Sequence, residues 1–212
     1  MNGRARSNAY VYAPRDRCAL IVDAGTDAAA KITDLVRAEN LEPQALVLTH
    51  GHPDHIWTAR ELSDRFEIPV FIHSADDVWF ADPATGGTMP VVRVAGRLYG
   101  RSRRLRPGRL RLFGEGDIDE GAFRIRTLHT PGHTRGSSCF VVDDLCFSGD
   151  TAFRGGLGHT SYPGGNRSAL RESIKSKLLA LPDDLRVLPG HGGDTTVGAE
   201  RALWESFTKG RR

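Results

Sequence analysis

The sequence lacks the long apolar run that a membrane-spanning helix requires, because none of its 212 residues lies in an apolar stretch of about 20 residues. Residues 1–7 are polar, without the apolar core of a secretory signal. Cysteine is scarce as well: Cys18, Cys139 and Cys146 are odd in number and show no CxxC spacing. A disulfide framework and a thiolate zinc site are therefore disfavoured, and we expect a cytoplasmic protein with buried free thiols.

Lysine is also rare, since only four of the 29 basic residues are Lys, while seven Arg lie within residues 97–111. Such a segment could attract an acidic substrate or a phosphate backbone. Aromatic residues that could stack on bases are few there, namely Tyr99 and Phe113, and the net charge is only +3. We therefore interpret the segment as a solvated face, and expect neither a nucleic-acid nor a membrane partner.

A single domain over residues 1–212 is expected, since 39% hydrophobic and 26% charged residues are typical of a globular protein. Apolar alternation and turn signals predict strands at residues 8–12, 18–22, 45–48, 69–72, 123–128, 138–142, 145–148 and 186–188. Helical patterns predict helices at residues 28–39, 56–66, 76–81, 168–181 and 197–207. This alternation favours an α/β layered fold.

Four potential metal ligands follow the predicted strand 45–48: His50, His52, Asp54 and His55. An extended backbone would direct the first two to one side, whereas the last two follow Pro53, which suits the first turn of a helix. The spacing therefore indicates two cations side by side. With 8 His and 17 Asp in the chain, such a cluster arises by chance in about one such chain in a thousand.

Three further potential ligands come directly after predicted strands and beside glycine: His133, Asp150 and His191. Loops at strand ends are where rigid scaffolds place functional side chains. Asp23 also ends a predicted strand, where it could support a metal ligand or bond to its own turn. For His73 and His129 the pattern favours a structural role.

The order of these motifs, HGHPDH, PGHT, SGDT and PGHG, resembles the metallo-β-lactamase superfamily. Within it, the chain is similar to the short glyoxalase II-like (hydroxyacylglutathione hydrolase-like) metallohydrolases. The resemblance spans about residues 8–207. It implies an α/β (α+β) fold, a four-layered αβ/βα sandwich with the metals at one edge between two sheets.

The resemblance also assigns the ligands. A first metal would be held by His50, His52 and His133. A second would be held by Asp54, His55 and His191, with Asp150 as the bridge. Imidazole and carboxylate without thiolate suit zinc, iron or manganese, and we expect two divalent ions, zinc foremost. Two such cations lower the pKa of a shared water, which yields a metal-bridged hydroxide, and Asp54 would orient it.

The function that follows is metal-dependent hydrolysis, most of all of thioesters of a small thiol. A thiolate leaves without a proton, which suits motifs that contain no general acid. The bridging aspartate separates the chain from zinc β-lactamases, which carry a cysteine or no ligand there, so a β-lactam substrate is disfavoured. The expected partner is a small molecule, an acyl thiol.

The loop at residues 158–165 differs from the relatives. His159 and Ser161 stand where glyoxalase II-like sequences carry Arg and Asp, which leaves the thiol open. Because this loop lies near the substrate in such relatives, His159 and Tyr162 are predicted substrate contacts.

Two alternatives stay open at this point. A persulfide dioxygenase-like oxidoreductase would use one iron held by two His and one Asp, and the additional ligands do not exclude it. A lactonase would use the same ligands as the thioesterase.

Overall fold

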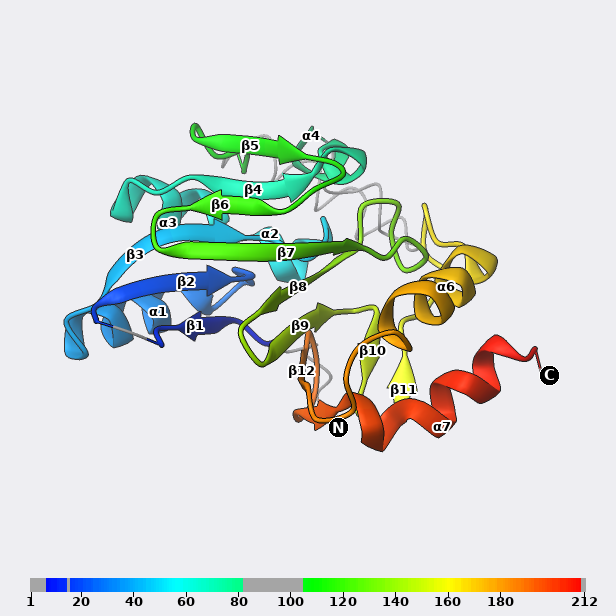
Figure 1. The fold of residues 1–212 in the computed structure, drawn as a ribbon. Coiled ribbons are helices and arrows are strands. Elements are labelled where there is room, and N and C mark those ends of the chain that lie inside the picture. The colour runs from blue at the N-terminus through cyan, green and yellow to red at the C-terminus, as the bar shows by residue number, and fades with distance from the viewer. Residues whose placement is uncertain (1–6, 15, 82–104, 211–212) are drawn as a thin grey trace, which may run out of the picture.

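The computed structural model describes residues 7–14, 16–81 and 105–210, which form two β-sheets with helices on their outer faces (Figure 1). The first sheet has the order β1-β2-β3-β4-β5, and the second has the order β13-β12-β9-β8-β7-β6. One buried apolar cluster lies between the sheets, and one lies under the helices on each side. This arrangement confirms the predicted four-layered αβ/βα sandwich.

The first sheet is parallel except at its edge. Its strands are β1 (Tyr10–Tyr12), β2 (Cys18–Val22), β3 (Glu42–Val47), β4 (Val70–His73) and β5 (Leu110–Phe113). Only β1 pairs antiparallel, with β2, as the predicted hairpin requires. Helices α1 (Ala28–Ala38) and α3 (Ala59–Phe66) cover the outer face. Side chains alternate along the strands: Ile21 packs toward these helices, while Leu20 and Val22 pack toward the second sheet.

The second sheet is antiparallel except where β12 joins β9. Its strands are β6 (Ile118–Glu120), β7 (Phe123–His129), β8 (Ser138–Val142), β9 (Leu145–Gly149), β12 (Arg186–Pro189) and β13 (Thr195–Thr196). Helix α6 (Arg167–Ser173), a π-helical turn (Ile174–Leu178) and α7 (Val197–Thr208) cover its outer face. Cys139 and Cys146 are buried free thiols there, as predicted, whereas Cys18 is only half-buried.

Several boundaries differ from the prediction. The helix expected at residues 56–66 is two helices, α2 (Pro53–Ile56) and α3, because Thr58 is bonded to the turn after β2: its N–H donates to the Ala24 carbonyl at 2.9 Å. The helix expected at residues 76–81 is a 3-10 turn (η1, Ser74–Asp76) followed by α4 (Val78–Ala81). Strand β3 begins three residues before the predicted residue 45. At Thr58 a tertiary hydrogen bond overrides the local pattern.

The carboxyl ends of six strands meet at one edge of the sandwich. Strands β2, β3 and β4 are parallel, and β7, β9 and β12 share a direction because β8 is antiparallel to both of its neighbours. At this edge the Ser138 N–H donates to the Thr49 carbonyl at 2.9 Å, which ties the two sheets together. The loops after these strands therefore face one another.

Most of the arginine-rich segment 97–111 lies outside the described residues. Of the part that is described, Arg106 forms an ion pair with Asp77, and Arg111 forms one with Glu120. Across residues 7–81 and 105–210, no helix has the length and apolarity needed to cross a membrane.

Candidate metal centre

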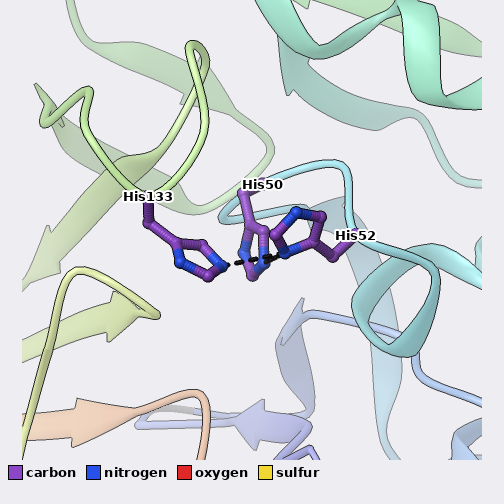
Figure 2. A group of neighbouring side chains, drawn as sticks. All are labelled: His50, His52 and His133. Atoms are coloured by element: carbon purple, nitrogen blue, oxygen red, sulfur yellow. Dashed lines mark hydrogen bonds between the residues drawn. The ribbon is translucent and has the colours of Figure 1, made fainter. Parts of the chain in front are cut away.

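Three histidines from two loops point at one position (Figure 2). His50 and His52 follow β3, and His133 lies in the loop between β7 and β8. His52 Nδ1 lies 3.1 Å from His50 Nε2 and 2.8 Å from His133 Nε2. All three side chains are buried. The structure thus brings together the triad that the family resemblance assigns to a first metal.

A second group lies beside the first. His191 Nε2 is 3.3 Å from Asp54 Oδ2, and His55 Nε2 is 3.7 Å from the same oxygen. Asp150, after β9, reaches both groups: its carboxylate oxygens lie 3.4 Å from His133 Nε2, 3.4 Å from His55 Nε2 and 3.5 Å from His191 Nε2. Asp150 therefore lies between the two groups.

These atoms fit a cation better than they fit one another. Ligand bonds of about 2.1 Å in a tetrahedral site place neighbouring ligand atoms about 3.4 Å apart. The spacings from 3.3 to 3.7 Å around Asp54 and Asp150 are close to this value. His55 Nε2 and Asp150 Oδ1 are buried without a hydrogen-bond partner among the described residues, and they face each other. Buried polar atoms normally have a hydrogen-bond partner. An imidazole nitrogen and a carboxylate oxygen without one are suitable ligands for a metal ion.

Hydrogen bonds on the far side of the rings fix which nitrogen faces the site. The Thr49 hydroxyl donates to Asp23 Oδ2, so its oxygen accepts from His50 Nδ1–H at 3.1 Å. His55 Nδ1–H donates to Asp23 Oδ2 at 2.8 Å, and His133 Nδ1–H donates to the His159 carbonyl at 2.7 Å. Each bond engages Nδ1 and turns Nε2 toward the centre, which is the atom through which the neutral imidazole would bind a metal.

The histidines of the two groups differ in the direction in which their surroundings shift the pKa. Burial and neighbouring imidazoles hold the pKa of His50 far below its usual value and lower the pKa of His52 to about 3, which keeps both rings neutral. Burial acts on His55 in the same direction, but the charge and hydrogen bond of Asp23, with Asp150 and Asp54, prevail and raise the pKa of His55 to about 9. Anionic charge is therefore concentrated around the second group, where it attracts cations.

Asp23 forms hydrogen bonds with residues that carry or orient metal ligands. The interpretation that it only bonds to its own turn is therefore insufficient. Its Oδ1 accepts the Thr49 N–H at 2.8 Å, and its Oδ2 accepts both the Thr49 hydroxyl and His55 Nδ1–H. The residue itself is buried and has a left-handed backbone, with φ of 60°. One carboxylate thus orients His55 directly and His50 through Thr49.

We expect Asp23→Asn to lower metal affinity by about 10- to 100-fold, the usual effect of removing a partner that orients a ligand. Asparagine also tolerates the left-handed backbone, so the change tests hydrogen bonding and not strain. Competition with a chromophoric chelator measures the affinity. Asp27→Asn, at the start of α1 without a side-chain cap bond, is the matched control. Unchanged affinity in Asp23→Asn would show that Asp23 has no such role.

The two predicted substrate residues lie on the loop that covers His133. The backbone carbonyl of His159 accepts the His133 bond, while its ring is exposed. The Tyr162 ring lies 5.7 Å from the His52 ring and 6.3 Å from the His133 ring, and its side chain is 40% exposed. Tyr162 therefore borders the open side of the first group.

The remaining two histidines form a separate pair. His73 and His129 stack with ring centroids 3.9 Å apart, and His129 Nε2 donates to the Arg135 carbonyl at 2.9 Å. Neither belongs to the clustered ligands. Their contacts are those of the structural role that the pattern favoured.

The sequence did not point to two supports of the ligand loops. Asn8 donates through its side-chain amide to the carbonyls of Pro189 and Gly192, on either side of His191, both at 2.9 Å. Asp76, predicted only as part of a helix, is buried against the loops of the first group. One sequence feature could have identified Asp76: like Asp23, it is an acidic residue shortly after the end of a strand.

Comparison with known proteins agrees with this geometry. The family profile described as Metallo-beta-lactamase superfamily matches residues 2–191. A Bacillus subtilis protein named probable metallo-hydrolase YqgX is 38% identical, over 94% of this chain and 91% of its own. The hydroxyacylglutathione hydrolase GloC of Haemophilus influenzae is 31% identical, over 88% of this chain and 85% of its own.

Two solved structures are similar throughout. BLEG-1, described as a B3 metallo-beta-lactamase, superposes with a TM-score of 0.80 at 35% identity and covers 97% of this chain and 96% of its own. TTHA1623, solved in a di-iron-bound form, has a TM-score of 0.71 at 31% identity and covers 94% of each chain.

Proposed function

The chain belongs to the metallo-beta-lactamase superfamily, and from that premise we propose that it is a dinuclear metallohydrolase of small-thiol thioesters. It is a metal-dependent hydrolase by family, and the dinuclear centre and the substrate are the proposal. The observation that carries it is Asp150, whose carboxylate lies within 3.5 Å of imidazoles from both ligand groups. A residue so placed suits a bridge between two cations, because one carboxylate has an oxygen to offer to each group.

The proposed ligands form two sets that match the two clusters of side chains in the structure. His50, His52 and His133 hold one cation, and Asp54, His55 and His191 hold the other. When bound, a pair of divalent cations supplies Lewis acidity and a hydroxide nucleophile near neutral pH. Zinc is the first candidate, while the di-iron form of TTHA1623 supports iron as the second.

Asp54 has a second task, which is to orient the attacking water. Its side chain is 32% exposed, whereas that of Asp150 is only 10% exposed. Asp54 is therefore the carboxylate of the cluster that faces the open side, where substrate and water arrive. Its hydrogen bond with His191 holds it in place.

The state of these acids favours a leaving group that needs no proton. Burial alone would raise the pKa of Asp54 and of Asp150, but the His191 hydrogen bond and the neighbouring imidazoles prevail, lowering the pKa of Asp54 to about 2 and lowering that of Asp150 as well. Both are carboxylates at neutral pH and have no proton to donate. A thiolate leaves unprotonated, which supports a thioester, and the GloC relative supports an acylated thiol.

Tyr162 and the loop of His159 are the proposed wall of the substrate site. The exposed Tyr162 ring stands edge-on to His52, so an acyl group at the first cation would lie against it. An apolar ring with a hydroxyl at its tip suits a substrate with an apolar body and a polar end.

The test is a substrate panel on the metal-loaded protein: thioesters of several small thiols, a persulfide with oxygen uptake recorded, an acyl-homoserine lactone and a chromogenic β-lactam. Enzymes discriminate between substrates by the ratio of their kcat/KM values. We expect the best thioester to have a kcat/KM at least about tenfold above that of any other substrate class in the panel. A higher kcat/KM for the persulfide, with one iron per chain, would replace the proposal with the dioxygenase alternative.

A β-lactam is included because BLEG-1 carries that description at 35% identity. Against it stands Asp150, since a carboxylate at this position differs from the cysteine, or the missing ligand, of zinc β-lactamases. Turnover of the β-lactam above every thioester would overturn the thioesterase assignment while leaving the metal centre intact.

A further inference from the structure

Asp76 is a buried acid that the proposed mechanism does not use. It ends the 3-10 turn after β4 and is only 1% exposed. Burying a carboxylate costs several kcal/mol unless hydrogen bonds compensate for the lost water. Its partners therefore indicate what this acid stabilises.

All three partners belong to the two loops that carry the first ligand group. Asp76 Oδ2 accepts the Gly51 N–H at 2.8 Å and the Thr134 hydroxyl at 2.6 Å. Its Oδ1 accepts the Gly136 N–H at 2.7 Å. Gly51 lies between His50 and His52, and Thr134 directly follows His133. One carboxylate thus links the backbone of both loops.

The loops approach this segment so closely that side chains are excluded. A Cβ at Gly136 would lie 2.6 Å from Asp76 Cγ, and one at Gly51 would collide with the Trp79 ring. Trp79 in turn stands edge-on to the His52 ring, with centroids 4.7 Å apart. The segment from Asp76 to Trp79 therefore fixes the loop backbone and one ligand ring together.

Such an external support has a physical purpose. The three converging nitrogens lie 2.8 and 3.1 Å apart. His50 and His133 both turn an Nε2 lone pair to this position, and the single Nδ1–H that His52 could offer cannot fully satisfy both, so the two lone pairs favour separation until a cation lies between them. The loops would separate unless other contacts held them. Hydrogen bonds to a charged acceptor in a buried site are the strong kind, and three of them meet at Asp76.

We propose that Asp76 is a positioning residue that preorganises the first metal site, formed by His50, His52 and His133, and does so selectively. Within the described part of the chain, its hydrogen bonds go to Gly51, Thr134 and Gly136, and none goes to a ligand of the second group. The inference rests on the metal centre proposed above. It adds a residue that binds no metal and contacts no substrate, and yet sets the affinity of one of the two sites.

The test measures zinc binding to the full chain by competition with a chromophoric chelator, in the wild type and in Asp76→Asn. The asparagine keeps the size, but it cannot accept from all three donors. We expect a loss of about 10- to 100-fold at one site and none at the other. Asp77→Asn, the same change one residue along at an acid that pairs with Arg106, should bind as the wild type does.

Double variants identify the affected site. In a His191→Ala background the first site remains, and Asp76→Asn should weaken it by the same factor; in a His52→Ala background it should add nothing. Cobalt-loaded protein gives a second readout, since only the absorption bands of the first site should change. If Asp76→Asn does not fold, Thr134→Val removes one of the three bonds and should give a smaller loss at the same site.

Equal weakening of both sites, or no weakening, would overturn the inference. Failure of the wild type to bind two ions would instead overturn the proposed function. The two failures are therefore distinguishable in one set of titrations.

Discussion

Replacing His52 with alanine should lower kcat/KM for a thioester by about a thousandfold and should remove one of the two metal equivalents that the proposal expects. His52 Nδ1 is the atom that lies within 3.1 Å of both other histidines of the first group, so its loss opens the site on one side. A bound cation contributes several kcal/mol to transition-state stabilisation, and each loss of about 1.4 kcal/mol lowers the rate tenfold. Steady-state kinetics and elemental analysis on the same preparation measure both effects.

His129→Ala is the matched control for His52→Ala. His129 stacks on His73 and lies outside the ligand cluster, so its removal should leave two metals per chain. If His52→Ala keeps both metals and the wild-type rate, the assignment of the first site is wrong.

Replacing Asp150 with asparagine should lower the metal content from two ions to about one, with a loss in kcat/KM of about a thousandfold. Two cations about 3.5–4 Å apart repel each other, and a carboxylate between them offsets that repulsion. Asparagine removes this charge and presents an amide NH2 toward the site. The change is close to isosteric, which matters because Asp150 is packed between three imidazoles.

The control for Asp150 lies at the other end of the same strand. Asp144 precedes β9 in an exposed turn, and Asp144→Asn should leave metal content and rate unchanged. Two firmly bound metals in Asp150→Asn would mean that the carboxylate is no bridge. Loss of both metals would mean that neither site forms without it.

The α/β layering and the candidate ligands at strand ends were accessible from short patterns in the sequence, whereas the four-layered sandwich was implied by the family resemblance of the motifs. Apolar strands followed by His or Asp beside glycine recur at His50, His133, Asp150 and His191, and parallel strands bring their carboxyl ends to one edge. Local patterns also predicted the first hairpin and both terminal helices correctly. Hydrophobic periodicity is sufficient for elements of this kind.

The supports of the site were not accessible, because they depend on contacts between distant residues. The bonds of Asp76 reach residues 25, 58 and 60 positions away, and Asn8 holds the loop of His191 from more than 180 positions away. The break between α2 and α3 has the same origin, since Thr58 is bonded to Ala24. A pattern read along one segment contains no information on such pairs.

The most direct measurement of the central claim is a metal titration of the metal-free full chain, with thioester hydrolysis followed at each step. The bridged centre around Asp150 predicts that activity rises until two equivalents of zinc, iron or manganese are bound per chain, and then stays constant. Full activity at one equivalent, or less than one ion bound per chain at saturation, would contradict the dinuclear centre.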